Sequence, residues 1–414
     1  MHQIGSILEI EPISQPDKTG EAELERADRV MRQGVERVFP AAVLLIKQYG
    51  DVIFQRAYGW LDPEAKRQPV QPDSLFDLAS LTKLFTAAAF MTLVEAGYVG
   101  LDTAVSQILP EFNGIQPVTA AIDPQTKRPI PPNPQFAGQM VDTAAITFRH
   151  LLTHTSGLPA WWDFCPSRHA PDTVPYPWEI PDNARAVRLA AFYERLAFAA
   201  PPGRQIIYSD IGFILLGEAI ARLSGMSPAA YLKQAVLEPL GMKHTVYNPL
   251  AQGVSPERLA PAEFCRWRRR RCRGEVHDEN AACLGGVAGH AGLFAPAEDV
   301  AALGQLYLNN GRLSQTRLFS PQLAAAATQE QAVRDGERRG LGWLLPSADS
   351  PVGRSMGANS YGHTGFTGTS LWVDPERELV VVLLTNRVYY GRDPHGIKNF
   401  RIRLHDAVTA DLKA

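Results

Sequence analysis

The sequence predicts an α+β protein in which an antiparallel β-sheet, flanked by terminal helices, carries a second and mostly helical domain. Two β-rich runs meet at a turn in residues 41–60, "AAVLLIKQYGDVIFQRAYGW". The arrangement recurs near the C-terminus in residues 368–387, "GTSLWVDPERELVVVLLTNR". Amphipathic patterns at 21–38 and 397–412 predict a helix at each end of the chain.

The middle of the chain has a different pattern, which predicts the helical domain. Apolar residues recur at helical spacing in five segments, 81–96, 185–198, 211–224, 228–238 and 297–309. We therefore expect residues 1–80 and 340–414 to form a discontinuous sheet domain, and residues 81–339 to form a mostly helical insertion with long loops. The proline-rich connection 110–140 is expected to be a surface excursion.

Composition narrows the classes of partner. The 414 residues have a net charge of -2, which does not favour nucleic acid or an anionic membrane. No run approaches the roughly 18 consecutive apolar residues of a membrane span. The basic run Arg266 to Arg271 is interpreted as a solvated surface loop rather than an anion site. Because the N-terminus lacks the pattern of a secretory signal, the expected location is cytoplasmic.

Two segments contain residues that could ligate a metal. The four cysteines are Cys165, Cys265, Cys272 and Cys283. Since no two of them form a C-x-x-C pair, we expect free, reduced thiols. The weaker alternative is a zinc ion held by Cys265, Cys272, His277 and Cys283. His277, Asp278 and Glu279 also have ligand chemistry, but we expect them to tie a loop to a cleft rim by hydrogen bonds. We therefore predict that the protein needs no metal and no cofactor.

The segment "DLASLTKLFTAAAF", residues 77–90, contains a candidate nucleophile. Ser80 and Lys83 stand three residues apart at the start of an apolar helical pattern, so they share one face of the helix. Serine needs activation to act as a nucleophile. We expect burial to lower the proton affinity of Lys83 so that it can help to ionise Ser80.

The segment "PPGRQIIYSDIGFILLGEAI", residues 201–220, supplies a second candidate for proton transfer. Tyr208 follows a Pro-Pro-Gly turn and precedes a helical pattern, a place from which a phenol can project into a cleft. It is predicted to share the proton of Ser80 with Lys83. Asp210, two residues further on, is expected to face the same site.

A third segment, "YGHTGFTGTSLWVDP" at 361–375, is predicted to be a strand that lines the site. Gly365 lets the backbone approach a substrate, and the Phe366 N–H is predicted to complete an oxyanion hole with the Ser80 N–H. His363 is expected to hold a substrate carboxylate or to orient the tyrosine.

In this order, "SLTK", "YSD" and "HTG" resemble the motifs of the serine β-lactamase and penicillin-binding superfamily, in its class C β-lactamase and family VIII carboxylesterase branch. The segments "RHLLTHTSGLP" (149–159) and "EPLGMKHTVYNP" (238–249) extend the resemblance, as does 285–311, over about 40–408. It implies a β-lactamase/transpeptidase-like fold with the cleft between its two domains. It also implies that Ser80 is acylated, with Lys83 and Tyr208 moving its proton.

Two departures from the family pattern shape the expected substrate. Asp210 stands where class C β-lactamases have asparagine, and His363 replaces a lysine that helps to bind the β-lactam carboxylate. Since an aspartate repels that carboxylate, the sequence favours a serine hydrolase of neutral short-acyl esters or related amides.

Two alternatives stay open for the function. One is a β-lactamase or D-Ala/D-amino-acid peptidase acting on cell-wall-type fragments, and the other is a catalytically silent, penicillin-binding-like module. The expected partner is a small-molecule ester or amide, without nucleic acid or membrane. The oligomeric state stays open, with a homo-oligomer among the options.

Overall fold

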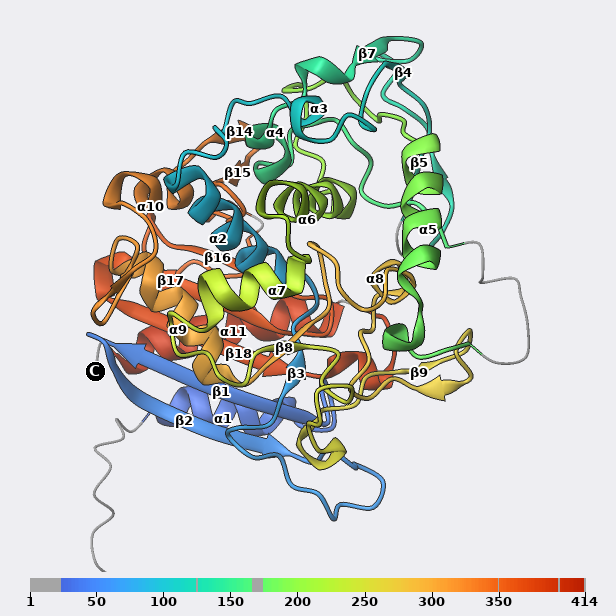
Figure 1. Ribbon diagram of the computed structural model, residues 1–414. Coiled ribbons are helices and arrows are strands. Elements are labelled where there is room, and N and C mark those ends of the chain that lie inside the picture. The colour runs from blue at the N-terminus through green and yellow to red at the C-terminus, as the bar shows by residue number, and fades with distance from the viewer. Residues whose placement is uncertain (1–23, 124–125, 166–173, 349, 394, 413–414) are drawn as a thin grey trace, which may run out of the picture.

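The computed structural model describes residues 24–123, 126–165, 174–348, 350–393 and 395–412. Its centre is a five-stranded antiparallel sheet in the order β16-β17-β18-β1-β2 (Figure 1). The strands are β1 (Ala41–Gln48), β2 (Asp51–Gly59), β16 (Tyr361–Thr364), β17 (Ser370–Asp374) and β18 (Leu379–Thr385). Both predicted hairpins are confirmed. They join through β1 and β18, where Leu44 is opposite Leu383.

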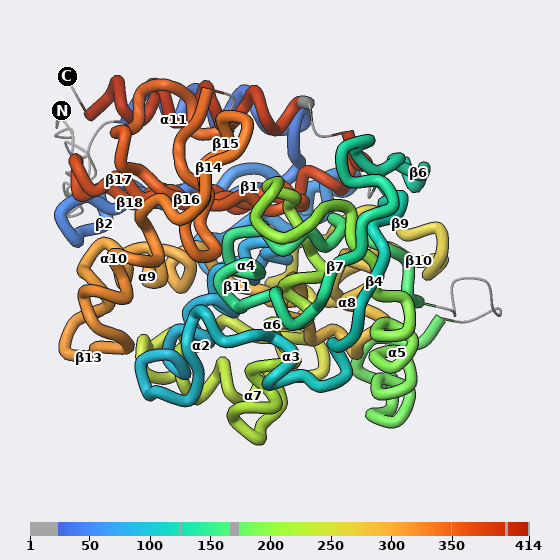
Figure 2. Tube along the Cα trace, turned by 90° about the horizontal axis from the view of Figure 1, so that it is seen from above, coloured from blue at the N-terminus to red at the C-terminus, as the bar shows by residue number. Residues whose placement is uncertain are grey.

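The terminal helices cover one face of this sheet. Helices α1 (Glu25–Gly34) and α11 (His395–Asp411) pack side by side although they come from opposite ends of the chain (Figure 2). Alternation along β1 explains the layering, because Leu44 and Ile46 point to the cluster that contains these helices. Val43 and Leu45 point to the opposite face and join the main core.

The helical part of the molecule lies against the other face, which α9 (Ala297–Leu308) contacts directly. Helices α2 (Thr82–Glu95), α6 (Asp210–Ser224) and α7 (Pro228–Leu232) pack against one another, and α7 continues as a π-helical turn over Lys233–Leu237. Helix α5 spans Asp182–Glu194. These elements confirm the predicted helices and the α+β class. The domain boundaries at 80/81 and 339/340 stay a prediction. In the described residues, every helix is too short or too polar to cross a bilayer.

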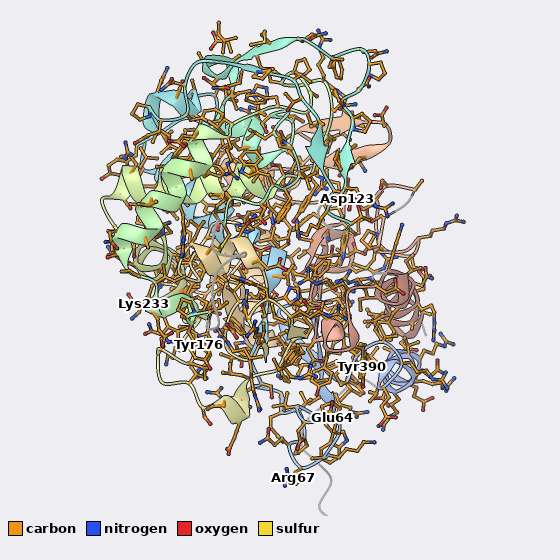
Figure 3. All side chains as sticks on the ribbon, turned by 90° about the vertical axis from the view of Figure 1, so that its right-hand side faces the viewer. Glu64, Arg67, Asp123, Tyr176, Lys233 and Tyr390 are labelled. Carbon is orange, nitrogen blue, oxygen red and sulfur yellow. A yellow bond between two sulfur atoms is a disulfide. The ribbon has the colours of Figure 1, made fainter. Side chains whose placement is uncertain are left out.

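The connection 110–140 is an excursion built from short strands. They are β4 (Ile115–Pro117), β5 (Ala121–Ile122), β6 (Pro129–Ile130) and β7 (Met140–Asp142). Figure 3 views the molecule from the side on which β5 lies in Figure 1, and it labels Asp123 of the excursion. The excursion is not only surface decoration, because Lys127 reaches a cavity described below.

The expectation of four free thiols is wrong. Cys165 and Cys283 form a disulfide that joins two segments 118 residues apart in the sequence, with their Cα atoms 6.0 Å apart. Cys265 and Cys272 are free and buried. Because Cys283 is used in the disulfide, the zinc set of Cys265, Cys272, His277 and Cys283 does not exist. Cysteine spacing could not reveal this pair, since the fold alone brings the two residues together.

The interpretation of the run Arg266 to Arg271 as a solvated loop is also wrong in part. Arg266 and Arg269 are exposed, but Arg268 is 4% exposed and forms an ion pair with buried Glu275. Its guanidinium donates hydrogen bonds to the backbone carbonyls of residues 276, 277 and 278, at 2.7, 3.3 and 3.3 Å. A buried arginine therefore fixes the loop that carries His277 and Asp278.

Candidate active site

Ser80 lies in a tight turn at the edge of the helical part. Strand β3 (Phe76–Asp77) pairs with β11 (Leu293–Ala295), and the chain then enters a 3₁₀ turn over Ala79–Leu81. Helix α2 begins at Thr82, so Ser80 precedes the α-helix instead of starting it. Apolar side chains of α2 are buried on all sides, which fixes the turn rigidly to the core.

The residue before the nucleophile has an unusual backbone. Ala79 has a φ of 46°, in the left-handed region that costs an L-residue about 1 kcal/mol. The buried carboxylate of Asp77 holds this conformation by accepting a hydrogen bond from the Ala79 N–H at 2.8 Å. It also accepts one from the His277 N–H at 2.7 Å. One carboxylate thus ties the nucleophile turn to the loop fixed by Arg268.

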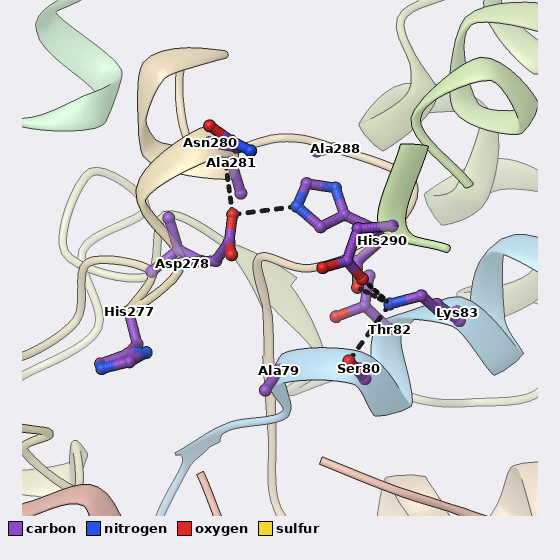
Figure 4. A network of polar contacts seen from close by, with 12 residues as sticks. Ala79, Ser80, Thr82, Lys83, His277, Asp278, Asn280, Ala281, Ala288 and His290 are labelled. Atoms are coloured by element: carbon purple, nitrogen blue, oxygen red, sulfur yellow. Dashed lines mark hydrogen bonds and ion pairs between the residues drawn. The ribbon is translucent and has the colours of Figure 1, made fainter. Parts of the chain in front are cut away.

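Lys83 is fully buried and donates three hydrogen bonds, the maximum for an ammonium group (Figure 4). Its acceptors are the Ser80 Oγ at 3.1 Å, the Asp210 Oδ1 at 2.7 Å and the His290 carbonyl at 3.1 Å. Burial by itself lowers the pKa of Lys83, but the charge of Asp210 and the neighbouring Tyr208 outweigh it, and the pKa is raised. The expectation of a lowered proton affinity is therefore wrong.

The ion pair with Lys83 changes the expected electrostatic effect of Asp210 on a substrate carboxylate. Its carboxylate lies 2.7 Å from the Lys83 ammonium, so the two charges compensate each other. The repulsion of a substrate carboxylate that the sequence suggested is offset by Lys83. A charged Lys83 cannot accept the Ser80 proton at rest, but it stabilises negative charge that develops on the Ser80 Oγ.

Tyr208 lies next to this pair, as the sequence predicts. Its ring centroid is 4.9 Å from the Lys83 Nζ and 4.6 Å from that of the His154 ring. Ser209 fixes the segment by capping α6 and by donating to the Pro159 carbonyl at 2.7 Å. Within the described part of the chain, the Tyr208 hydroxyl is buried without a hydrogen-bond partner. The Tyr208 side chain thus lies beside the Lys83 ammonium, and its role in proton transfer stays a prediction.

The turn after strand β16 packs directly on the nucleophile segment. Thr367 and Thr369 donate through their hydroxyls to the carbonyls of Asp77 and Leu78, at 2.7 and 3.0 Å. A Cβ on Gly365 would lie 2.6 Å from the Leu78 carbonyl oxygen, so only glycine fits there. Phe366, the next residue, lines the cavity that contains Ser80. The assignment of its N–H to an oxyanion hole stays a prediction.

His363 does not line the catalytic cavity. It is 3% exposed, and its Nδ1 lies 2.9 Å from the Thr364 carbonyl. Burial, with the nearby charges of Arg339 and Lys83, holds the pKa of His363 well below its ordinary value. A neutral imidazole cannot supply the positive charge that the sequence suggested for a substrate carboxylate. Its ring centroid is 5.8 Å from that of Tyr208, so the role of orienting that tyrosine stays a prediction.

A cavity of about 260 Å³ contains Ser80, and we call it the catalytic cavity. Its lining brings together residues from eight separate parts of the chain: Ala79, Ser80, Lys127, Ala160, Trp161, Tyr208, Asp210, His277, Asp278, Glu279, His290, Ala291, Phe366 and Arg392. Sequence reasoning missed Lys127, Trp161, His290 and Arg392 as site residues. No local pattern marks them, because each reaches the cavity only through the tertiary fold.

His277, Asp278 and Glu279 each contact another side chain of the protein. The Asp278 Oδ1 lies 2.9 Å from the His290 Nε2, and Glu279 pairs with Arg392 at 2.8 Å (Figure 4 shows the former). The His277 Nε2 lies 3.1 Å from Glu263. Burial raises the pKa of Glu263, but hydrogen bonds from His277 and Arg392 prevail and lower it to about 2. The expected tie between loop and rim is thus the arrangement that the structure shows.

Asp77→Asn is expected to lower kcat by about 10-fold while KM changes little, because Ala79 and His277 donate to different carboxylate oxygens and one of these becomes an amide NH2 group, which cannot accept. Leaving one of these buried N–H groups unpaired also costs about 1–3 kcal/mol of unfolding free energy. Steady-state kinetics and urea unfolding measure the two effects. Asp73→Asn, at a side chain that is 63% exposed, is the matched control. A kcat within twofold of the wild type in Asp77→Asn contradicts the positioning role.

The chain is similar to known proteins over most of its length. A profile of the Beta-lactamase family matches residues 27–404. The N-acetylmuramyl-L-alanine amidase of Bacillus subtilis (strain 168) is 32% identical over 395 residues, 88% of this chain and 81% of that protein. A putative D-alanyl-D-alanine carboxypeptidase of Escherichia coli (strain K12) is 29% identical over 398 residues, 90% of this chain and 85% of that protein.

Among solved structures, EstCE1, a hydrolase with promiscuous acyltransferase activity, has a TM-score of 0.64 at 24% identity, covering 91% of this chain and 97% of that one. The chain belongs to the β-lactamase family, as its motifs predict, and it has the fold of the serine hydrolases of that family. The names of these relatives refer to different reactions.

Proposed function

We propose that the protein is a serine hydrolase that transfers the acyl group of a small ester or related amide to Ser80 and then to water. The observation that carries the proposal is the hydrogen bond from the buried Lys83 ammonium to the Ser80 Oγ at 3.1 Å, at the edge of a cavity that Tyr208 also lines. A serine beside a fixed cation and a proton donor is equipped for acyl transfer.

Acylation proceeds by attack of the Ser80 Oγ on the substrate carbonyl carbon. As that bond forms, the Ser80 proton moves to the Tyr208 oxygen, and the Tyr208 proton moves to the leaving oxygen or nitrogen, so no net proton is gained or lost. Lys83 keeps its proton and stabilises the charge on the Oγ. The N–H groups of Ser80 and Phe366 are assigned to the carbonyl oxygen.

Deacylation runs through the same groups in reverse. A water molecule takes the place of the leaving group, gives one proton to Tyr208 and attacks the acyl carbon. Tyr208 returns its own proton to the Ser80 Oγ as the ester bond breaks. Asp210 is not a base in this scheme, because its carboxylate is committed to Lys83.

The catalytic cavity favours a short acyl group, because about 260 Å³ lies below the usual range for drug-sized ligands, roughly 300–1,000 Å³. A second candidate function is hydrolysis of an amide in a cell-wall-type fragment. Two observations favour it: the names of the amidase and carboxypeptidase relatives, and the compensation of Asp210 by Lys83. The second observation removes the main objection to a substrate that carries a carboxylate.

Hydrolysis of p-nitrophenyl butyrate, nitrocefin and a D-alanyl-D-alanine peptide, side by side, tests the proposal. We expect Ser80→Ala to lower ester hydrolysis by at least about 10³-fold, because it removes the attacking atom. Intact mass spectrometry should show a butyryl adduct on the wild type and none on Ser80→Ala. Ser106→Ala, in the short helix α3 (Val105–Ile108), is the control. Turnover of the peptide alone moves the assignment to the second candidate, and turnover of nitrocefin alone to the β-lactamase alternative.

A further inference from the structure

A second cavity adjoins the catalytic cavity, and the side chains of Lys127 and Trp161 line both. Its volume is about 510 Å³. The other lining residues come from the excursion (residues 119–122), from the segment after Pro159 and from the chain beyond α5, at Arg195 and Ala197. Lys127 and Trp161 thus lie at the boundary between the cavity that contains Ser80 and the second cavity.

The wall between the cavities, residues 159–163, is fixed to three other elements. The Asp210 N–H donates to the Ala160 carbonyl at 2.9 Å, and the Asn280 side chain donates to the Trp162 carbonyl at 2.9 Å. The Trp162 ring stacks on Phe192 of α5, with centroids 5.3 Å apart. Contacts with α5, α6 and α8 (Glu279–Cys283) thus make the wall a preformed part of the fold.

The lining of the second cavity is mostly apolar, and its charged residues are Lys127, Arg195 and Asp163. Trp161, Trp162, Ile122 and alanine residues supply apolar surface. The Lys127 Nζ lies 3.4 Å from the Trp161 ring centroid, so an ammonium group is held where the two cavities meet. An aromatic or other apolar group fits the interior, and a carboxylate fits the junction.

The position of the wall also indicates which part of the substrate lies in the second cavity. The hydrogen bond from Asp210 to Ala160 joins the wall to the segment that carries Tyr208, two residues earlier. In the proposed function Tyr208 gives its proton to the leaving group, so the leaving group lies beside this wall. We propose that the second cavity binds the leaving-group arm of the substrate, an apolar arm with a carboxylate that pairs with Lys127. This inference rests on the proposed function.

Two acetyl esters that differ only in the charge of the leaving group test the inference. They are 4-acetoxybenzoate and 4-acetoxybenzamide, with phenyl acetate as the reference that has no arm. In the wild type we measure the ratio of kcat/KM for the benzoate to that for the benzamide. Lys127→Met is expected to lower this ratio by up to about fivefold, the upper end of the effect of an exposed charge pair. Lys233→Met, at a side chain that is 70% exposed, is the control.

Filling the second cavity separates its contribution from that of Lys127. Ala197→Trp and Ala121→Leu each place extra atoms in that cavity and outside the catalytic one. We expect kcat/KM for both substituted esters to fall relative to phenyl acetate by about fivefold. The inference is overturned if both variants keep the wild-type ratio of kcat/KM for the substituted esters to kcat/KM for phenyl acetate. The carboxylate assignment is overturned if Lys127→Met leaves the benzoate-to-benzamide ratio within twofold of the wild type.

A binding measurement keeps the test independent of turnover. In Ser80→Ala, binding of 4-hydroxybenzoate and 4-hydroxybenzamide, the two leaving groups themselves, is followed by quenching of tryptophan fluorescence. Tighter binding of the benzoate that is lost in Lys127→Met/Ser80→Ala supports the subsite. Equal binding of both compounds, or no binding of either, overturns it. Failure of the proposed function has a different signature, which is hydrolysis of phenyl acetate that does not depend on Ser80.

Discussion

Lys83→Met is expected to lower kcat/KM for p-nitrophenyl butyrate by about 10³-fold, because it removes the cation that stabilises charge on the Ser80 Oγ. The variant also leaves the Asp210 carboxylate, 19% exposed, without its partner. Breaking such a pair from one side costs about 3 kcal/mol of unfolding free energy. Kinetics with titration of active sites and urea unfolding measure the two effects.

A double variant separates the catalytic effect from the loss of stability. In Lys83→Met/Asp210→Asn the uncompensated charge is gone, so we expect the unfolding free energy to recover while the activity does not. Lys233→Met is the surface control for the same change of side chain. If Lys83→Met keeps activity within tenfold of the wild type, Lys83 does not have the assigned role.

Asp210→Asn is expected to reverse the way in which stability depends on pH in the alkaline range. In the wild type, burial opposes the charged form of Lys83, but Asp210 prevails, and the pKa is raised above that of the unfolded chain. The folded state then binds more protons above about pH 10.4, so its stability falls as the pH rises beyond that value. Without Asp210, burial dominates and lowers the pKa of Lys83 below its unfolded value.

The sign of the slope is therefore the readout. In Asp210→Asn the unfolded state binds more protons as the pH approaches about 10.4 from below, so stability rises with pH over that range. Thermal melting of the wild type and the variant from pH 7 to 11 measures the difference. The same series on Lys83→Met should show neither effect, because the titrating group is absent. Parallel curves for the wild type and Asp210→Asn contradict the ion-pair account.

The sequence predicted the layered fold because the information was local. Alternating apolar residues around Gly50–Asp51 define the first hairpin, and 3.6-residue periodicity defines α6 and α9. Ser80, Lys83, Tyr208 and Asp210 could be proposed from the sequence because each stands in a short motif near the start of a helix. The structure brings all four together in one place.

What the sequence could not reveal depends on distant partners. Burial alone suggested a Lys83 that gives up its proton, and only the approach of Asp210, 127 residues away, shows the opposite. Arg268 looked solvated because a run of arginines says nothing about a buried Glu275. Cys165 and Cys283 are adjacent only after α8 has packed on the segment that contains Trp162.

The packing of the β16–β17 turn on the nucleophile segment has a consequence for biosynthesis. Asp77 and Leu78 leave the ribosome early, but the threonines that bind their carbonyls, Thr367 and Thr369, are made only after nearly the whole chain. Strand β1 is likewise made long before β18, the strand that pairs with it. A chain that ends before residue 361 has Ser80 but lacks the two threonines that hold its segment in place. We therefore expect the nucleophile segment to reach its final conformation only after the last strands have been made.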